Sequence, residues 1–461
     1  MKRALIITYY WPPSGGSGVQ RWLKFAKYLP QYGWEPVIYT PSNPEANTED
    51  AALLKDIAPG TEVIKTKIWE PYSFYKALFG GKKNTSEGGK RIKANIIGSE
   101  NKSFTHRLSL FIRGNFFIPD PRCLWIRPSI KYLVKYLKEH PVDVIISTGP
   151  PHSMHLIAKG VSKATGIRWI ADFRDPWTEI FYFKHLNLSK WAFRRHRSLE
   201  QSVLDSADTA VVVSRQMQED FARRTTTPVK VITNGFDHED FETSSATDEA
   251  MLHNGKFQLV HTGIFVDNGN PHLLWEVLGE KAALNPQFKE DLQIRLMGQV
   301  DDTVLQGIEN AGLQENLHNM GYRPHTEVVQ WQQRAQVLLL PLRKEPEAAA
   351  ILTGKFFEYL ASGREILAFG PTDGDLAKAL RETQSGTIVD FYDKEATRAQ
   401  LERLYEKYLK EKEENCGEEN NMTRKKGELS EPVMRYSRKF LTGEMVKLFE
   451  KDEKYRVEKD S

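Results

Sequence analysis

The feature that most constrains the fold is a repeated alternation of short apolar runs with longer amphipathic stretches. Several runs are apolar almost throughout and rich in β-branched residues, which is typical of parallel strands covered on both faces. The stretches between them, such as residues 19–31 and 152–165, have helical periodicity. The strand candidates of the first half are Ala4–Thr8, Pro36–Thr40, Val142–Ser147, Trp169–Ala171, Ala210–Val213 and Val229–Ile232. This order predicts a doubly wound α/β domain.

A polar segment, Asn234–Asn254, interrupts this alternation and indicates a passage between domains. Strands are predicted again at Phe257–Thr262, Gln293–Met297, Val337–Pro341, Glu365–Phe369 and Thr387–Val389. A chain of 461 residues is also too long for one ordinary domain. We therefore predict Rossmann-like domains over residues 1–236 and 237–430. Residues 431–461 are expected to form a helix that packs back toward the N-terminal domain.

Charge and cysteine content exclude several classes of protein. The formal net charge of +3 is nearly balanced, so nothing indicates a nucleic-acid-binding surface. The two cysteines, Cys123 and Cys416, cannot supply a disulfide framework or a cysteine-based metal site, and they suit a reducing cytosol. The start MKRALIITYY is followed by Trp-Pro-Pro instead of a cleavage pattern, and no apolar run is long enough to cross a bilayer. We expect a cytoplasmic protein.

A glycine-rich turn, SGGSG at residues 14–18, follows the first predicted strand and precedes the first predicted helix. It lacks the Gly-Lys-Ser/Thr of a P-loop. It also lacks the third glycine of a dinucleotide fingerprint, and the strand at 36–40 has no acidic residue after it to hold a ribose. Two interpretations remain: Gly15, Gly16 and Gly18 let backbone amides approach a ligand, or they only turn a strand into a helix.

Polar residues also follow two predicted strands of the first domain. ADFRDPW places Asp172, Arg174 and Asp175 at the carboxyl end of a strand, where open α/β sheets bind ligands. These carboxylates could orient an acceptor hydroxyl or take its proton, and an Arg–Asp pair that fixes the loop is the alternative. STGPPHSMH places His152 at the start of a helix. A metal site there is not expected, because no third ligand lies nearby in the sequence.

In the second half, LTGKFFEYLASGREILAFG combines a helix-forming run with an apolar strand. Glu358 could accept hydrogen bonds from two sugar hydroxyls, and Lys355 lies one turn earlier on the same side of the helix. Thr353 and Gly354 precede that helix and could present free amides to a diphosphate. Gly374, in the loop after the next strand, could add a further amide. A solvated glutamate, a surface lysine and plain turn chemistry are the alternatives.

Taken together, TYYWPPSGGSGVQRW, NGFD at 234–237 and LTGKFFEYLASGREILAFG resemble GT-B glycosyltransferases. The best match is family four, the retaining enzymes, of the type found in bacterial polysaccharide gene clusters. The resemblance covers nearly the whole chain and implies two Rossmann-like domains facing each other across a cleft. It assigns the nucleotide-sugar donor to the C-terminal domain, with Glu358 on the ribose, and mostly the acceptor to the N-terminal domain. Gly15, Gly16 and Gly18 would line the cleft, and His152 would contact the donor sugar.

The sequence departs from this family at two places. An acidic residue is usual about two helical turns before Glu358, and Ala350 stands there. An Arg and a Lys are usual after the first strand of the donor domain, where this chain has Gly263, Asn268, Gly269 and Asn270. A leaving diphosphate still needs positive charge or amide donors. Arg323 and the Arg343–Lys344 pair are the available substitutes, and each is equally interpretable as a surface charge.

The resemblance implies a retaining, metal-independent glycosyltransferase without a cofactor. It would move a sugar from a nucleoside-diphosphate donor to a hydroxyl of a glycan or lipid-linked acceptor, in cell-surface polysaccharide or glycoconjugate synthesis. Two alternatives remain: a non-hydrolysing nucleotide-sugar epimerase, and a non-catalytic nucleotide-sugar-binding protein. The basic, aromatic segment Lys102–Arg122 either packs on the core or lies peripherally on the cytoplasmic face of the inner membrane.

Overall fold

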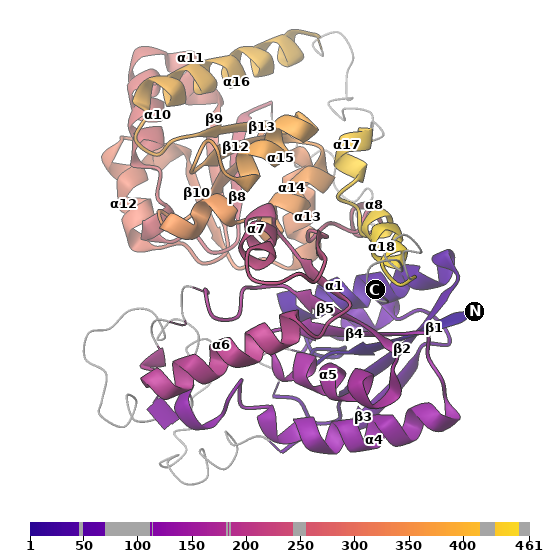
Figure 1. Cartoon of the computed structure of the whole chain (residues 1–461). Helices are drawn as coiled ribbons and strands as arrows, with labels where there is room; N and C mark the ends of the chain where they lie inside the picture. Colours follow the sequence, from indigo (N-terminus) through magenta and orange to yellow (C-terminus); the bar gives the residue numbers. More distant parts are fainter. Residues whose placement is uncertain are drawn as a thin grey trace, which may run out of the picture. The chain divides into compact units, whose positions relative to one another are not determined.

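The computed structural model describes residues 1–45, 49–69, 111–112, 114–180, 183, 186–242, 255–414 and 429–450 (Figure 1). The chain divides into two compact units. Unit 1 comprises Met1–Val213, Met217–Ile232 and the described part of Thr442–Ser461, and unit 2 comprises Ser214–Gln216 and Thr233–Leu441. The division therefore lies close to the predicted boundary at residue 236, and it also passes through two helices, α7 (Arg215–Ala222) and α18 (Arg438–Lys447).

Unit 1 is built on a sheet of parallel strands in the order β3-β2-β1-β4-β5-β6-β7. Leu5 and Ile145, from the central strands, belong to the buried core with Trp125 and Met154 from the adjoining helical segments. The strands are β1 (Lys2–Ile7), β2 (Trp34–Pro41), β3 (Glu62–Thr66), β4 (Val144–Gly149), β5 (Arg168–Phe173), β6 (Thr209–Val212) and β7 (Val229–Val231). The helices include α1 (Ser17–Tyr28), α4 (Ile126–Glu139), α5 (Ser153–Thr165) and α6 (Lys190–Leu204).

Unit 2 repeats this plan, with parallel strands in the order β10-β9-β8-β11-β12-β13. Its strands are β8 (Phe257–Thr262), β9 (Leu292–Met297), β10 (Leu317–Gly321), β11 (Val337–Pro341), β12 (Glu365–Phe369) and β13 (Gly386–Val389). Its helices are α8 (Glu239–Glu242), α10 (His272–Leu284), α11 (Pro286–Asp291), α12 (Asp302–Asn310), α13 (His325–Arg334), α14 (Gly354–Ser362), α15 (Asp375–Thr383), α16 (Lys394–Glu414) and α17 (Glu431–Met434).

Both faces of the unit 2 sheet are covered, which explains its nearly continuous apolar strands. Leu259 and Leu339 pack with residues of α10, α12 and α16 on one face. Val260 and Leu338, their neighbours in sequence, pack with residues of α13, α14 and α15 on the other. Side chains along a strand point alternately to the two faces, so one strand serves both cores.

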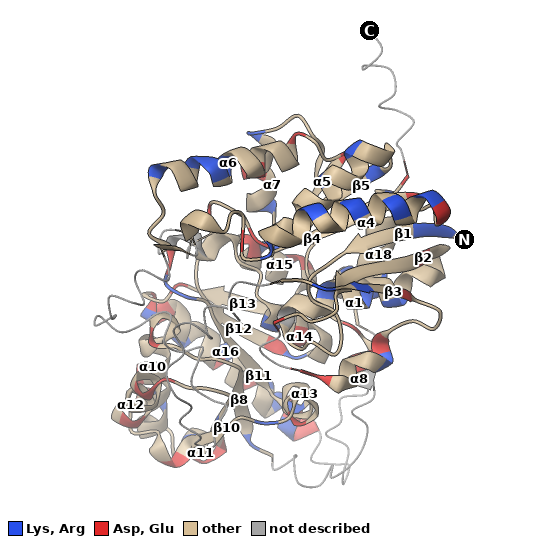
Figure 2. Ribbon diagram, turned by 90° about the horizontal axis from the view of Figure 1, so that it is seen from below, with Lys and Arg blue, Asp and Glu red and all other residues tan. Residues whose placement is uncertain are grey.

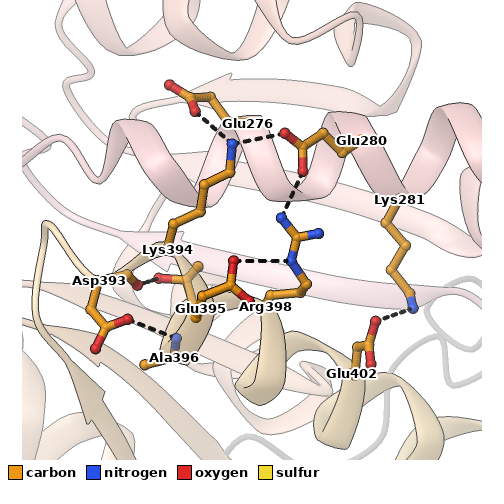
Figure 3. A network of polar contacts seen from close by, with 10 residues as sticks. Glu276, Glu280, Lys281, Asp393, Lys394, Glu395, Ala396, Arg398 and Glu402 are labelled. Carbon is orange, nitrogen blue, oxygen red and sulfur yellow. Dashed lines mark hydrogen bonds and ion pairs between the residues drawn. The ribbon is translucent and has the colours of Figure 1, made fainter.

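Charged side chains join α10 and α16 on the outside of unit 2 (Figure 3). Lys394 Nζ lies 3.2 Å from Glu276 Oε2 and 2.8 Å from Glu280 Oε1. Arg398 Nη2 lies 3.0 Å from the other oxygen of Glu280. These side chains are partly exposed to solvent, which screens their attraction, so the network orients the helices more than it stabilises the unit.

The last described residues belong to unit 1 and lie at the amino ends of its strands. Phe449 makes an edge-to-face contact with Trp34, at the start of β2, with ring centroids 4.9 Å apart. Arg168, at the start of β5, donates to the carbonyl of Leu448 over 3.2 Å. Lys2, at the start of β1, lies 2.6 Å from a carboxylate oxygen of Glu450.

The predicted α/β class with two doubly wound sheets is confirmed. β8, β11 and β12 have the predicted bounds, and the other predicted strands differ by a few residues at their ends. β3 and β10, which lie at the edges of their sheets, were not predicted. Their residues are only partly buried, so they lack the apolar runs that marked the central strands.

Candidate functional site

The two sheets change the direction of their strand order between β1 and β4 in unit 1, and between β8 and β11 in unit 2. Open α/β sheets bind ligands at the carboxyl ends of the strands that flank such a point. Most of the predicted site residues follow β1, β4, β8 or β11, whereas Asp172, Arg174 and Asp175 lie at the end of β5, Arg323 follows β10 and Gly374 follows β12. Each unit is considered by itself.

The glycine turn of unit 1 needs its glycines for backbone reasons. Gly16 precedes α1 with φ 93°, a left-handed conformation that favours glycine. A Cβ at Gly18 would lie 2.9 Å from Tyr10 Cδ2 and 3.2 Å from Arg174 Nη1. Gly15 is half-buried and Gly16 is exposed. Turn geometry and close packing therefore explain Gly16 and Gly18, and contact with an acceptor stays a prediction.

The prediction that Asp172 contacts an acceptor is corrected, because the structure places this residue in the interior. It is 0% exposed. Arg21 donates to it through two nitrogens, at 2.7 and 3.0 Å, and Trp22 Nε1 and Thr148 Oγ1 donate at 2.7 and 3.0 Å. Burial alone would raise its pKa, and the charge of Arg21 with these hydrogen bonds lowers it instead. Asp172 thus fixes α1 to β5 and acts structurally.

Arg174 spans the two loops of the unit 1 site. Its Nη1 donates to the carbonyl of Gly18 over 2.9 Å, and its Nη2 donates to the carbonyl of Pro150. Its guanidinium carbon lies 5.9 Å from the centroid of the Tyr10 ring. Arg174 therefore joins the glycine turn to the loop after β4 and forms no ion pair with Asp172 or Asp175 in the described residues.

Asp175 differs from Asp172 in having no hydrogen bond or ion pair to any residue that the structure describes. It is half-buried. Burial raises the pKa of its carboxyl group, and the neighbouring positive charge of Arg174 opposes that shift. An unpaired carboxylate with a raised pKa at a strand end is suited to accept a proton or a hydroxyl hydrogen bond.

His152, in the loop after β4, is held by an aromatic neighbour. Its ring stacks on Trp177 with centroids 4.4 Å apart and an interplanar angle of 2°. It is 7% exposed, and its pKa is well below the ordinary value because of burial and of the charges of His155 and Arg174. His152 is therefore neutral near pH 7, and it can donate or accept one hydrogen bond without carrying charge.

In unit 2, Lys355 lies against the end of β8. Gly263 has φ 110°, and a Cβ there would lie 2.1 Å from Lys355 Cε and 2.7 Å from its Nζ. Lys355 Nζ donates to the carbonyl of Ile264 over 3.4 Å. Burial lowers the pKa of the amine; Glu358 opposes this shift and Arg343 adds to it. The sequence did not predict that Gly263 is required to accommodate Lys355.

Glu358, also on α14, is linked to β8 through a glutamine that was not predicted as a site residue. Gln332 Nε2 donates to Glu358 Oε2 over 3.2 Å and to Thr262 Oγ1 over 2.9 Å. Glu358 is half-buried. One oxygen is thus oriented by the protein, and the other has no hydrogen bond among the described residues. Gln332 carried no sequence signal, because a glutamine on an amphipathic helix is ordinary.

The start of α14 presents backbone amides. Thr353 caps this helix, its Oγ1 accepting from Phe356 N over 3.3 Å, so its side chain is occupied. Gly354 is exposed, and a Cβ there would meet nothing within 4 Å. Gly374 is buried, and a Cβ there would lie 2.7 Å from the carbonyl oxygen of Ala349. Packing explains this glycine, and the contact of its amide with a ligand stays a prediction.

The three basic residues that could replace the usual Arg and Lys have different surroundings in the structure. Arg343 is exposed, and its charge acts on Lys355. Lys344 instead donates to the carbonyl of Asn270 over 3.0 Å, with its Nζ 4.8 Å from the Phe391 ring centroid. Arg323 is exposed, and its Nε lies 3.7 Å from Glu327 one turn away. Of these three cations, Arg343 is thus the one whose charge acts on Lys355.

Comparisons with known proteins agree with this architecture. A family model described as "Glycosyltransferase Family 4" matches residues 96–240, and one described as "Glycosyl transferases group 1" matches residues 256–407. A search of curated protein sequences gives no match. In the part of the chain that the structure describes, no helix is long and apolar enough to span a membrane.

Solved structures with the same fold cover almost the entire chain. A glycosyltransferase from Rickettsia africae is 13% identical, with 97% of each chain covered and a TM-score of 0.56. Sucrose-phosphate synthase from Thermosynechococcus elongatus is 13% identical, covering 97% of this chain and 98% of its own, at 0.54. TarM from S. aureus, in a complex with UDP, is 11% identical, covering 98% and 100%, at 0.52. At such low identity these structures establish the fold alone.

Proposed function

Since this chain belongs to the GT-B glycosyltransferases with family-four and group-one domains, we propose that it is a retaining enzyme that uses a nucleoside-diphosphate sugar. It transfers the sugar to a hydroxyl of a glycan or lipid-linked acceptor in cell-surface polysaccharide or glycoconjugate synthesis. It works on the cytoplasmic side, without a cofactor. Unit 2 binds the donor and unit 1 binds mainly the acceptor.

The observation that carries this proposal is the arrangement of Lys355, Glu358 and Gly263 at the end of β8. Lys355 reaches across Gly263 to the carbonyl of Ile264, so its ammonium lies at the strand end where the family resemblance predicts an Arg and a Lys. Glu358 has one oxygen oriented by Gln332 and another free to accept from ribose hydroxyls. The exposed amide end of α14 at Gly354 suits a diphosphate.

Charge stabilisation of the leaving diphosphate follows from the same residues. As the glycosidic bond breaks, negative charge grows on the diphosphate, and Lys355 and Arg343 oppose that charge. Burial is the main cause of the lowered pKa of Lys355, and the negative charge of a bound diphosphate would raise that pKa. Protein cations and amides thus take the part that a metal ion plays in other transferases, and we propose metal-independent transfer.

On unit 1, Asp175 is the carboxylate left for the acceptor once Asp172 is assigned to the interior, and His152 is the group expected to contact the donor sugar. Asp175 accepts a hydrogen bond from the attacking hydroxyl and orients it. Neutral His152 hydrogen-bonds a sugar hydroxyl, with its ring held by Trp177. In retaining enzymes of this family the acceptor hydroxyl attacks the sugar from the same face from which the leaving group departs. The departing phosphate therefore lies close to the hydroxyl and takes its proton.

The test is a donor screen with the full chain, in which released nucleotide is measured for UDP, GDP and ADP sugars with a cell-envelope extract as acceptor source. We expect one nucleotide class to be released, dependent on the extract and unaffected by EDTA. Loss of turnover in EDTA with recovery on adding Mg²⁺ would refute metal independence. Binding of a donor by calorimetry with no turnover in any extract would instead support a non-catalytic sugar-nucleotide binder.

A further inference from the structure

The first half of α6, in unit 1, combines features that are unfavourable for a helix in water. Lys190, Trp191, Arg194, Arg195 and Arg197, which we call the α6 patch, are all exposed. Trp191 is 66% exposed, and Arg194 and Arg195 follow it by three and four residues, so the three side chains share one helix face. Figure 2 shows Lys and Arg along this helix.

Charge in the α6 patch is of one sign and is not neutralised locally. The first turn of α6 contains no acidic residue, although the amino end of a helix favours negative charge. Among the residues that the structure describes, none of the patch cations forms an ion pair. The acidic side chain of this helix, Glu200, is 0% exposed and is occupied by Arg224 and Thr178 on the inner side. The cations therefore face outward, uncompensated.

Aromatic side chains lie on a second segment fixed to the same end of α6. Asn115 is buried, and its Oδ1 accepts from the backbone of Ser189, the capping residue of α6, over 2.7 Å. Its Nδ2 donates to the carbonyl of Phe111 over 2.8 Å. Phe116, the next residue, is 72% exposed, and Phe111 is 41% exposed. Exposed aromatic rings beside uncompensated cations are the composition of a surface that lies at a membrane interface.

We propose that the α6 patch, with Phe111 and Phe116, docks on a membrane surface that carries anionic lipid. The arginines meet lipid phosphates while Trp191 and the phenylalanines enter the interfacial layer. Phe111 and Phe116 belong to the segment Lys102–Arg122, for which a membrane contact was predicted from sequence, whereas the α6 patch does not. Residues 102–110 and 113 of that segment lie outside the described residues. Membrane docking would bring the enzyme to a lipid-linked acceptor. Only this purpose rests on the proposed function.

The experiment measures co-sedimentation of the full chain with vesicles, in the absence of donor and acceptor, so that it does not depend on enzymatic activity. Vesicles of phosphatidylcholine alone are compared with vesicles that also contain phosphatidylglycerol, at low and high salt. We expect binding to the anionic vesicles only, weakened by salt. The double variant Arg194→Gln/Arg195→Gln should bind about 25-fold more weakly, at roughly fivefold for each arginine. Trp191→Ala should also bind more weakly.

A charge-matched control is Lys230→Gln/Lys410→Gln, which removes two exposed lysines elsewhere and should bind like the unaltered protein. The altered side chains are exposed, so circular dichroism should show that every variant remains folded. Failure of the unaltered chain to bind anionic vesicles would overturn the proposal and leave an acidic protein as the partner of the patch. Equal loss in the control variant, or undiminished binding by the patch variants, would also overturn it.

Discussion

Acid should destabilise both units through two buried histidines. His155 in unit 1 is 0% exposed, with Nδ1 2.8 Å from Ser147 Oγ, and burial lowers its pKa to about 3. His261 in unit 2 is 2% exposed, with Nδ1 3.0 Å from the carbonyl oxygen of Leu339, and burial with the charge of Lys355 lowers its pKa to about 3. Both must be neutral in the folded state over a wide range of acidic pH.

The sign follows from proton counting. An unfolded chain protonates these histidines below about pH 6.5, whereas the folded chain does so only near pH 3. Their contribution to the free energy of unfolding is therefore complete above about pH 6.5 and is lost as the pH falls. Each loses about 1.4 kcal/mol per pH unit, or about 2 kcal/mol between pH 6.5 and pH 5.

Urea denaturation at pH 7.5 and pH 5, followed by circular dichroism, measures this loss in variants that replace each ring. His155→Asn and His261→Asn keep a side-chain group at the Nδ1 position but cannot be protonated. Each variant should lose about 2 kcal/mol less than the unaltered protein on acidification, in the transition of its own unit. His325→Asn, at an exposed position, is the control. An unchanged pH dependence in both interior variants would refute the reasoning.

Four further substitutions test the assignments. Asp172→Asn should lower the free energy of unfolding by about 3 kcal/mol or more, because it leaves buried Arg21 without its counter-charge. Asp175→Asn should lower the free energy of unfolding far less. Equal urea midpoints for the two variants would contradict the structural role of Asp172. Glu358→Ala should weaken donor binding about tenfold in calorimetry with the fold intact, and unchanged affinity would remove Glu358 from the site. Gly263→Ala should displace Lys355 and lower thermal stability by about 1–3 kcal/mol, so an unaltered melting temperature and donor affinity would refute the close approach.

The strands could be predicted because burial on both faces leaves a mark that is local in sequence. β8, β11 and β12 are buried along nearly their whole length and are mostly apolar, so their bounds could be read from the sequence. β10 could not, since most of its side chains are partly or fully exposed. The helix that carries Lys355 and Glu358 was also predictable, because Thr353 and Gly363 mark its two ends.

The roles of the site residues were less predictable, because they depend on partners distant in sequence. Asp172 follows the predicted strand Trp169–Ala171 as a ligand-binding carboxylate would, and its neutralising partner Arg21 lies 151 residues away. Nothing near either residue distinguishes an interior pair from an exposed one. Gly263 was predicted to bind the donor, and this stays a prediction. Its close contact with the side chain of Lys355, from another element of unit 2, could not be read from the sequence.

The contact between Phe449 and Trp34 has a consequence for biosynthesis. A ribosome completes every strand of the first sheet long before it reaches Phe449, so a nascent chain waits with the Trp34 indole lacking this cover. Final closure of the first unit must therefore follow synthesis of the entire second unit. A chaperone or protease that recognises aromatic surface would find its longest opportunity during that interval.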